Sequence, residues 1–311
     1  MFIRNTTLGG LALSLPKIDV LDEIMPPLEN VPRRKLGRNK DELSIIGFGG
    51  IMLNNNSQEF ANENIAKAFD NGVNYYDVAP SYGNAIDKMG PALKPYRNKC
   101  FLACKTTKRD KLGAQTELNE SLQKLNTDHF DVYQIHALTS VDDVNKAFGP
   151  DGAMETFLQA KRDGKVRLIG FSAHSVDAAL RAMELYDFDT VLFPFNFVCW
   201  NAGNFGPQVI EKAKQTNKGL LALKSMALTT LKKGENKVFP NCWYRPVMDD
   251  ETLSMAFRYT LSLDITAAVS PGEAQLFWKG VEIAKRFKPI NETEKEKLLA
   301  LAKVTEPVFK A

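Results

Sequence analysis

Short apolar segments alternate with amphipathic segments along the chain from Ser44 onward, and no polar linker is long enough to divide the series. The amphipathic segments repeat apolar residues at helical spacing, as Leu118, Leu122 and Leu125 do. Strands that alternate with helices in this way form parallel βα units. The pattern therefore predicts one continuous α/β domain.

Eight strands are predicted, at residues 45–48, 73–78, 101–105, 130–136, 166–171, 190–193, 219–223 and 265–269. Eight βα units in sequence are the number that closes a (β/α)₈ or TIM barrel. We therefore expect a single-domain barrel from Ser44 to about Lys285. Residues 33–43, with Gly37 and Asn39 between two short runs, predict a hairpin before the barrel, and residues 292–303 predict one extra helix after it.

Several helix positions can be read from the same pattern. One helix is predicted to start near Ser57, and Ser175 is placed to cap another. A third presents Met154, Phe157 and Leu158 on its apolar face. Further helices are predicted over residues 206–217, around 253–261 and over 274–285.

The first 32 residues do not fit the barrel pattern and are interpreted as a leader, which leaves residues 33–311 as the barrel domain. Residues 1–15 read MFIRNTTLGGLALSL, in which Arg4 precedes a short apolar stretch. This segment resembles the latter half of a bacterial twin-arginine export signal, although the Arg-Arg pair is absent. The prediction is a cytoplasmic protein, or a periplasmic one if the segment is the remnant of a truncated signal.

Composition narrows the classes of protein further. Hydrophobic residues make up 44% and charged residues 25% of the 311 positions, which is typical of a globular protein and argues against disorder or a coiled coil. A net charge of +3 is too small to indicate a nucleic-acid partner. No apolar run approaches the roughly 20 residues of a membrane span. The four cysteines include one C-x₃-C pair and indicate neither a disulfide framework nor a metal site.

Four polar residues lie at, or shortly after, the ends of three successive predicted strands: Asp77, Tyr82, Lys105 and His136. In such barrels the loops after the strands build the active site. Taken singly, each has a structural interpretation, since Asp77 and Lys105 can form a salt bridge, His136 can be a buried histidine and Tyr82 a loop aromatic. Their occurrence together at one barrel mouth predicts a catalytic group.

The four residues have complementary chemical properties. A tyrosine has a pKa of about 10, which a neighbouring ammonium group lowers. We therefore expect Lys105 to lower the pKa of Tyr82 and Asp77 to keep Lys105 charged. Tyr82 then donates a proton to a carbonyl oxygen that receives a hydride, and His136 orients or polarises the carbonyl.

These residues carry a resemblance to the aldo-keto reductase superfamily. The matching segments are LGR at 36–38, GFGG at 47–50, GVNYYDVAPSYG at 72–83, LACKT at 102–106, SLQKLNTDHFDVYQIHAL at 121–138 and GKVRLIGFSAHS at 164–175. The resemblance implies NAD(P)H-dependent reduction of an aldehyde or ketone, a small-molecule carbonyl, with Asp77, Tyr82, Lys105 and His136 as the catalytic set. A Rossmann fingerprint is rejected because Met52 stands where its third glycine is required.

The resemblance also implies a cofactor site at the barrel mouth, formed by Gly50, Ile51, Asp77, Ser172, His174, Lys224, Ser225, Ser270, Gly272, Gln275 and Lys279. The chain departs from the common family pattern at Ala173-His174 and Leu192, and at Lys224, where an aromatic residue is usual. His174 and Lys224 are expected to make substitute hydrogen bonds or to contact an acidic substrate; His174 alternatively lies beside a helix cap without a role.

NADP(H) is the expected cofactor, and NAD(H) stays open because the loop after the last strand is short and offers only Lys279 for a 2′-phosphate. Lys224-Ser225 resembles a branch of the family with a C-terminal iron-sulfur domain, but no cysteine cluster follows Cys242, so neither an iron-sulfur cluster nor another metal is expected.

Trp200 and Trp243 are candidates to line the substrate pocket beside Tyr82 and His136, although aromatic residues that simply cover the barrel rim would look the same. Two alternatives to a reductase remain open. The altered cofactor positions suit a non-catalytic cofactor-binding sensor or accessory subunit, and a barrel hydrolase or isomerase would use no nicotinamide at all.

Overall fold

The computed structural model describes residues 30–311, which form a closed barrel of eight parallel strands in the order β12-β3-β4-β5-β6-β7-β8-β9. The strands are β3 Ile46–Gly49, β4 Tyr75–Asp77, β5 Phe101–Thr106, β6 Phe130–Leu138, β7 Val166–Ala173, β8 Thr190–Pro194, β9 Gly219–Leu223 and β12 Ala267–Val269. The predicted barrel is confirmed. The interpretation of residues 1–32 as a leader falls almost entirely outside the described residues.

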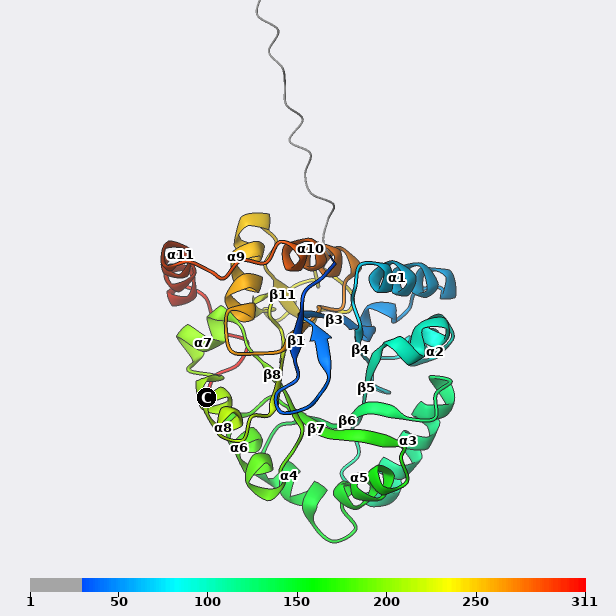
Figure 1. The fold of residues 1–311 in the computed structure, drawn as a ribbon. Coiled ribbons are helices and arrows are strands. Elements are labelled where there is room, and N and C mark those ends of the chain that lie inside the picture. The colour runs from blue at the N-terminus through cyan, green and yellow to red at the C-terminus, as the bar shows by residue number, and fades with distance from the viewer. Residues whose placement is uncertain (1–29) are drawn as a thin grey trace, which may run out of the picture.

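Helices surround the barrel (Figure 1). They are α1 Gln58–Asp70, α2 Ala85–Leu93, α3 Lys111–Lys124, α4 Val141–Phe148, α5 Ala153–Arg162, α6 Val176–Leu185, α7 Phe197–Gly203, α8 Pro207–Gln215, α9 Asp250–Leu261, α10 Ala274–Lys285 and α11 Glu292–Lys303, with 3₁₀ turns η1 Gly50–Leu53 and η2 Lys94–Lys99. The sequence pattern did not predict α2, α4, α7 or the small hairpin of β10 Ala227–Thr230 and β11 Tyr244–Pro246.

Two serines cap helices at the expected places. Ser57 Oγ accepts a hydrogen bond from Phe60 N at 3.1 Å, and Ser175 Oγ accepts one from Ala178 N at 3.3 Å. The apolar face predicted for α5 is wrong at one position, because Leu158 is 36% exposed.

The alternation of side chains along each strand decides which residues face the barrel axis. Tyr75, Phe101, Ala103 and Val132 belong to the cluster that fills the barrel interior. Residues two positions further along these strands therefore also point inward, toward the carboxyl end of the barrel. Asp77 on β4 and Lys105 on β5 occupy those positions, and His136 lies four positions beyond Val132 on β6.

A hairpin of β1 Arg33–Lys35 and β2 Glu42–Ser44 closes the opposite end of the barrel, where Figure 1 shows it in dark blue. Leu36 and Leu43 are fully buried against the interior cluster. Gly37 has a φ of +53°, and a Cβ there would lie 2.4 Å from Gly219 N, so only glycine fits this turn.

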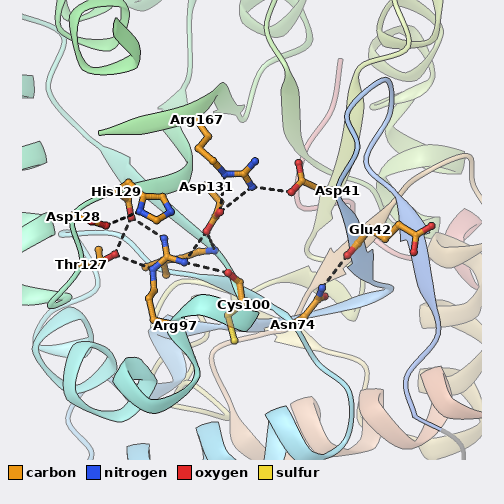
Figure 2. Close-up of polar contacts among 11 residues, drawn as sticks. Asp41, Glu42, Asn74, Arg97, Cys100, Thr127, Asp128, His129, Asp131 and Arg167 are labelled. Carbon is orange, nitrogen blue, oxygen red and sulfur yellow. Dashed lines mark hydrogen bonds and ion pairs between the residues drawn. The ribbon is translucent and has the colours of Figure 1, made fainter. Parts of the chain in front are cut away.

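A buried carboxylate joins this hairpin to the barrel (Figure 2). Asp131 on β6 pairs with Arg97 at 3.0 Å and with Arg167 at 2.9 Å, and it accepts a hydrogen bond from Leu102 N at 2.8 Å. Arg167 also binds Asp41 of the hairpin at 2.8 Å. The network fixes the hairpin at the base and leaves the mouth free for a site.

Within residues 30–311, no helix combines the length and the apolar character that a membrane crossing requires.

Candidate active site

The predicted catalytic residues meet at the carboxyl end of the barrel. Asp77 ends β4 and Lys105 lies near the end of β5, and their side chains are 2% and 1% exposed. The Lys105 ammonium group donates to Asp77 Oδ1 and, at 3.3 Å, to the Val78 carbonyl oxygen. Tyr75 Oη donates to Asp77 Oδ2 at 3.2 Å. The carboxylate is therefore held on both oxygens and fixes the lysine.

Tyr82 reaches the same place from the loop after β4. Its ring centroid lies 5.5 Å from Lys105 Nζ and 5.7 Å from the ring of His136, with the two rings edge to face at 84°. The next residue, Gly83, has a φ of +57°, and a Cβ there would lie 2.1 Å from Asn54 Oδ1. The glycine thus permits the tight turn that brings the tyrosine over the barrel mouth.

His136 is positioned by a distortion of β6. Ala137 has a φ of +54°, and its N–H donates to Ser172 Oγ at 2.7 Å. Arg109 donates to the His136 carbonyl oxygen at 2.7 Å, which fixes the backbone from the other side. The His136 Nδ1 atom lies 3.4 Å from Ser81 Oγ. The other ring nitrogen is thus available to a ligand.

The protonation states follow from burial and charge. Burial raises the pKa of Tyr82 more than Lys105 lowers it, so the expected net decrease in that pKa is wrong. Burial alone would lower the pKa of Lys105, but Asp77 and Tyr82 raise it above the usual value. Burial and Lys105 hold the pKa of His136 well below its ordinary range. At neutral pH the site contains a phenol, an ammonium group and a neutral imidazole.

A cavity of about 140 Å³ opens beside Tyr82 and His136. It gathers six of the predicted cofactor residues, namely Ile51, Asp77, His174, Lys224, Ser270 and Gly272. Three of the predicted substrate residues, Tyr82, His136 and Trp243, also lie in its wall. Asn241, Leu223 and Tyr244 line it as well. These residues come from the carboxyl ends of the strands, such as Asp77 on β4 and His136 on β6, and from the loops after β3, β4, β7, β9 and β12, as an active site of this fold requires.

Three predicted cofactor residues are buried around the cavity. Gly50 lies in η1 against the Asp77 carbonyl oxygen, and Ser172 Oγ is occupied by the Ala137 N–H. Ser225 Oγ is buried and has no hydrogen-bond partner among residues 30–311. A buried hydroxyl without a partner is costly unless a ligand satisfies it.

The structure does not bring the remaining predicted residues to this cavity. Gln275 and Lys279 line a separate groove along α10, where Lys279 Nζ pairs with Asp250 at 2.5 Å. Trp200 on α7 is partly buried against the outer core and is absent from the cavity wall.

Three contacts that shape the site could not be found from the sequence. Asn54 donates to Asn241 Oδ1 at 3.0 Å and so ties the stretch before β11 across the mouth. Phe309, near the C-terminus, stacks on His174 with 5.1 Å between ring centroids. Arg109 pairs with Asp143 while it holds His136. Each contact joins residues far apart in sequence, so no local pattern reports it.

Among the described residues, no group of three or more His, Cys, Asp or Glu side chains is placed to hold a metal ion.

Comparisons with known proteins agree with the geometry. The model of the aldo/keto reductase family matches residues 45–301. The aldo-keto reductase YhdN of Bacillus subtilis is 28% identical over 50% of this chain and 49% of its own length. The aldo-keto reductase yakc [NADP(+)] of Schizosaccharomyces pombe is 29% identical over 52% of this chain and 51% of its own length. The aligned region thus spans about half the length of these curated relatives.

Among solved structures, the holo form of aldo-keto reductase AKR11C1 from Bacillus halodurans superposes with a TM-score of 0.70. The two sequences are 20% identical, and the match covers 90% of this chain and 99% of the Bacillus halodurans chain. At this identity the likeness supports the barrel fold alone. The family match itself extends from the first barrel strand into α11 and includes all four catalytic candidates. The chain belongs to the aldo/keto reductase family of oxidoreductases.

Proposed function

We propose that the protein reduces an aldehyde or ketone to an alcohol with NAD(P)H, and that Tyr82 is the general acid. The observation that carries the proposal is the convergence of the Tyr82 phenol, the buried Asp77–Lys105 pair and neutral His136 on one cavity. Each group has the protonation state that this chemistry needs.

The residues divide the reaction between them. The cofactor, when bound, supplies a hydride to the carbonyl carbon. Tyr82 gives its phenolic proton to the carbonyl oxygen, which completes the alcohol. Lys105 stabilises the phenolate that remains, and Asp77 keeps Lys105 protonated. His136 donates a hydrogen bond that orients the carbonyl, and because its pKa is held low it does so as a neutral imidazole, which leaves the proton transfer to Tyr82.

The cavity offers groups that fit a nicotinamide cofactor. The unpartnered Ser225 hydroxyl is available to an acceptor. At Gly272 a Cβ would lie 2.9 Å from Asn241 Cβ, so the glycine leaves a space that no other residue would leave. Ile51, His174 and Ser270 would complete the cofactor site. NADP(H) is the first choice because the relative yakc carries NADP(+) in its name, and NAD(H) is the alternative.

Tyr82→Phe tests the proposal. We expect the variant to lose roughly 100 to 10,000-fold in turnover of a simple aldehyde, because the general acid is missing. Its affinity for NADPH, followed by fluorescence titration, should stay near the wild-type value. Tyr96→Phe is the matched control, since Tyr96 stacks on Phe69 away from the cavity. Full turnover by Tyr82→Phe would contradict the assignment.

The second candidate is a non-catalytic sensor or accessory subunit that binds the cofactor. It is favoured by Leu192, which is buried in the barrel interior where the family commonly has a glutamine, and by Lys224 in place of an aromatic residue. Tight NADPH binding with no turnover across a broad carbonyl panel would support it. No fluorescence change with either cofactor would instead support a barrel enzyme that uses no nicotinamide.

A further inference from the structure

Lys224 places an uncompensated positive charge at the catalytic cavity. It follows β9 in a left-handed backbone conformation, with a φ of +64°. Its Nζ atom lies 5.2 Å from the ring centroids of both Trp243 and Tyr244. Within residues 30–311 this ammonium group forms no salt bridge, whereas Lys105 is paired with Asp77.

The rest of the cavity does not neutralise this charge. Asp77 is the only carboxylate in the part of the cavity wall that the structure describes, and both of its oxygens are already bound. His136 and His174 are uncharged at neutral pH, because burial lowers the pKa of both and brings that of His174 to about 4. The cavity therefore carries one net positive charge, which Lys224 supplies.

A partly buried ammonium group without an anion is unfavourable, and the two aromatic rings offset only part of its lost hydration. The chain thus maintains a charged group where an apolar one would be more stable. An anion bound in the cavity would complete the pairing and would be recognised strongly, since charge-assisted hydrogen bonds are about twice as strong as neutral ones.

We propose that Lys224 is a specificity residue that selects carbonyl substrates carrying a carboxylate, and this inference rests on the proposed reductase function. Lys224 and the proton donor Tyr82 line the same cavity, so the anionic end and the reacting carbonyl of one bound molecule can reach both residues. Trp243 forms the wall beside the anionic end.

The selectivity depends on pH. Burial, with Lys105 nearby, lowers the pKa of Lys224 to about 8. The positive charge is therefore present below pH 8 and is lost as the pH rises through 8, so the preference for an anionic substrate falls between pH 7 and pH 9. The titratable and charged groups that face Lys224 or share the cavity with it are Asp77, Tyr82, Lys105, His136, His174, Cys242 and Tyr244.

The test compares 4-carboxybenzaldehyde with its methyl ester, a neutral substrate of similar shape. The readout is the ratio of kcat/KM for the acid to kcat/KM for the ester, because an effect on cofactor binding changes both values equally. We expect the wild type to favour the acid roughly tenfold to a hundredfold at pH 7, as a hydrogen bond to a charged group predicts. The ratio should approach one at pH 9.

Three variants assign the effect to Lys224. Lys224→Met should bring the ratio close to one, and Lys224→Arg should retain much of the preference. Lys233→Met removes the same charge from an exposed position between β10 and β11 and should keep the wild-type ratio. An unchanged ratio in Lys224→Met would overturn the inference. A loss of NADPH affinity with the ratio retained would also overturn it, because Lys224 would then serve the cofactor.

The outcomes separate this inference from the proposed function. Equal turnover of the acid and the ester by the wild type contradicts only the role of Lys224. If neither aldehyde is turned over, the reductase proposal fails, and calorimetric titration with 4-(hydroxymethyl)benzoate decides the anion site. Binding to the wild type that is lost in Lys224→Met supports the site, and no binding to the wild type refutes it.

Discussion

At the scale of single residues, burial decides the chemistry as much as charge does. The sequence identifies Asp77, Tyr82, Lys105 and His136 because each lies at or shortly after the end of a strand, and the structure brings them together. It does not reveal how deeply they are buried. For that reason the direction of the Tyr82 pKa shift could not be predicted correctly from the neighbouring lysine alone.

Burial of His174 also makes the stability of the folded protein depend on pH. In the unfolded chain a histidine takes up a proton near pH 6.5, whereas the folded pKa of His174 is about 4. Between these values the unfolded state binds more protons, so the free energy of unfolding falls as the pH falls. The contribution is fully present above pH 6.5 and is lost toward pH 4.

We expect His174→Phe, which keeps an aromatic ring against Phe309, to flatten this dependence. The slope of unfolding free energy against pH, measured by urea denaturation between pH 6 and pH 4.5, should decrease by about 1.4 kcal/mol per pH unit. Identical slopes for the variant and the wild type would show that His174 titrates normally in the folded protein.

At the scale of elements, prediction succeeds where hydrophobic periodicity is strong. The bounds of α10 and α11 agree with the sequence pattern residue for residue, because both begin after a clear polar break. The short helix α7 and the hairpin of β10 and β11 were missed, since neither is long enough to show a period. Both belong to loops at the barrel mouth, whose shape depends on tertiary contacts rather than on local pattern.

The hairpin of β1 and β2 shows how one buried charge can join an element to the barrel. Asp131→Asn should destabilise the protein by about 3–5 kcal/mol in urea unfolding, because it weakens two arginine pairs in a buried place. Asp41→Asn is the matched control, because Asp41 lies at the more exposed edge of the same network. It should lower the free energy of unfolding by only about 0–1 kcal/mol. Equal costs would mean that Asp131 is not the link between hairpin and barrel.

At the scale of the whole molecule, one end of the barrel is closed for stability and the other is open for chemistry. Eight strand-helix units could be predicted from sequence, and with them the place where the four candidate catalytic residues meet. The limits of the cavity could not be predicted, because they depend on contacts between distant parts of the chain. Asn241 lines the cavity and is bound by Asn54, and Phe309 stacks on the lining residue His174. The substrate side of the site is therefore defined by the tertiary structure.

The central claim is that this cavity transfers a hydride to a carbonyl carbon while Tyr82 supplies the proton. The most direct measurement uses NADPH deuterated at its transferable hydrogen, with 4-carboxybenzaldehyde as substrate and NMR of the product. The account predicts an alcohol with one deuterium on the former carbonyl carbon, formed by the wild type and, over the same time, at least roughly 100-fold less by Tyr82→Phe. An alcohol without deuterium, or equal product from the variant, would contradict it.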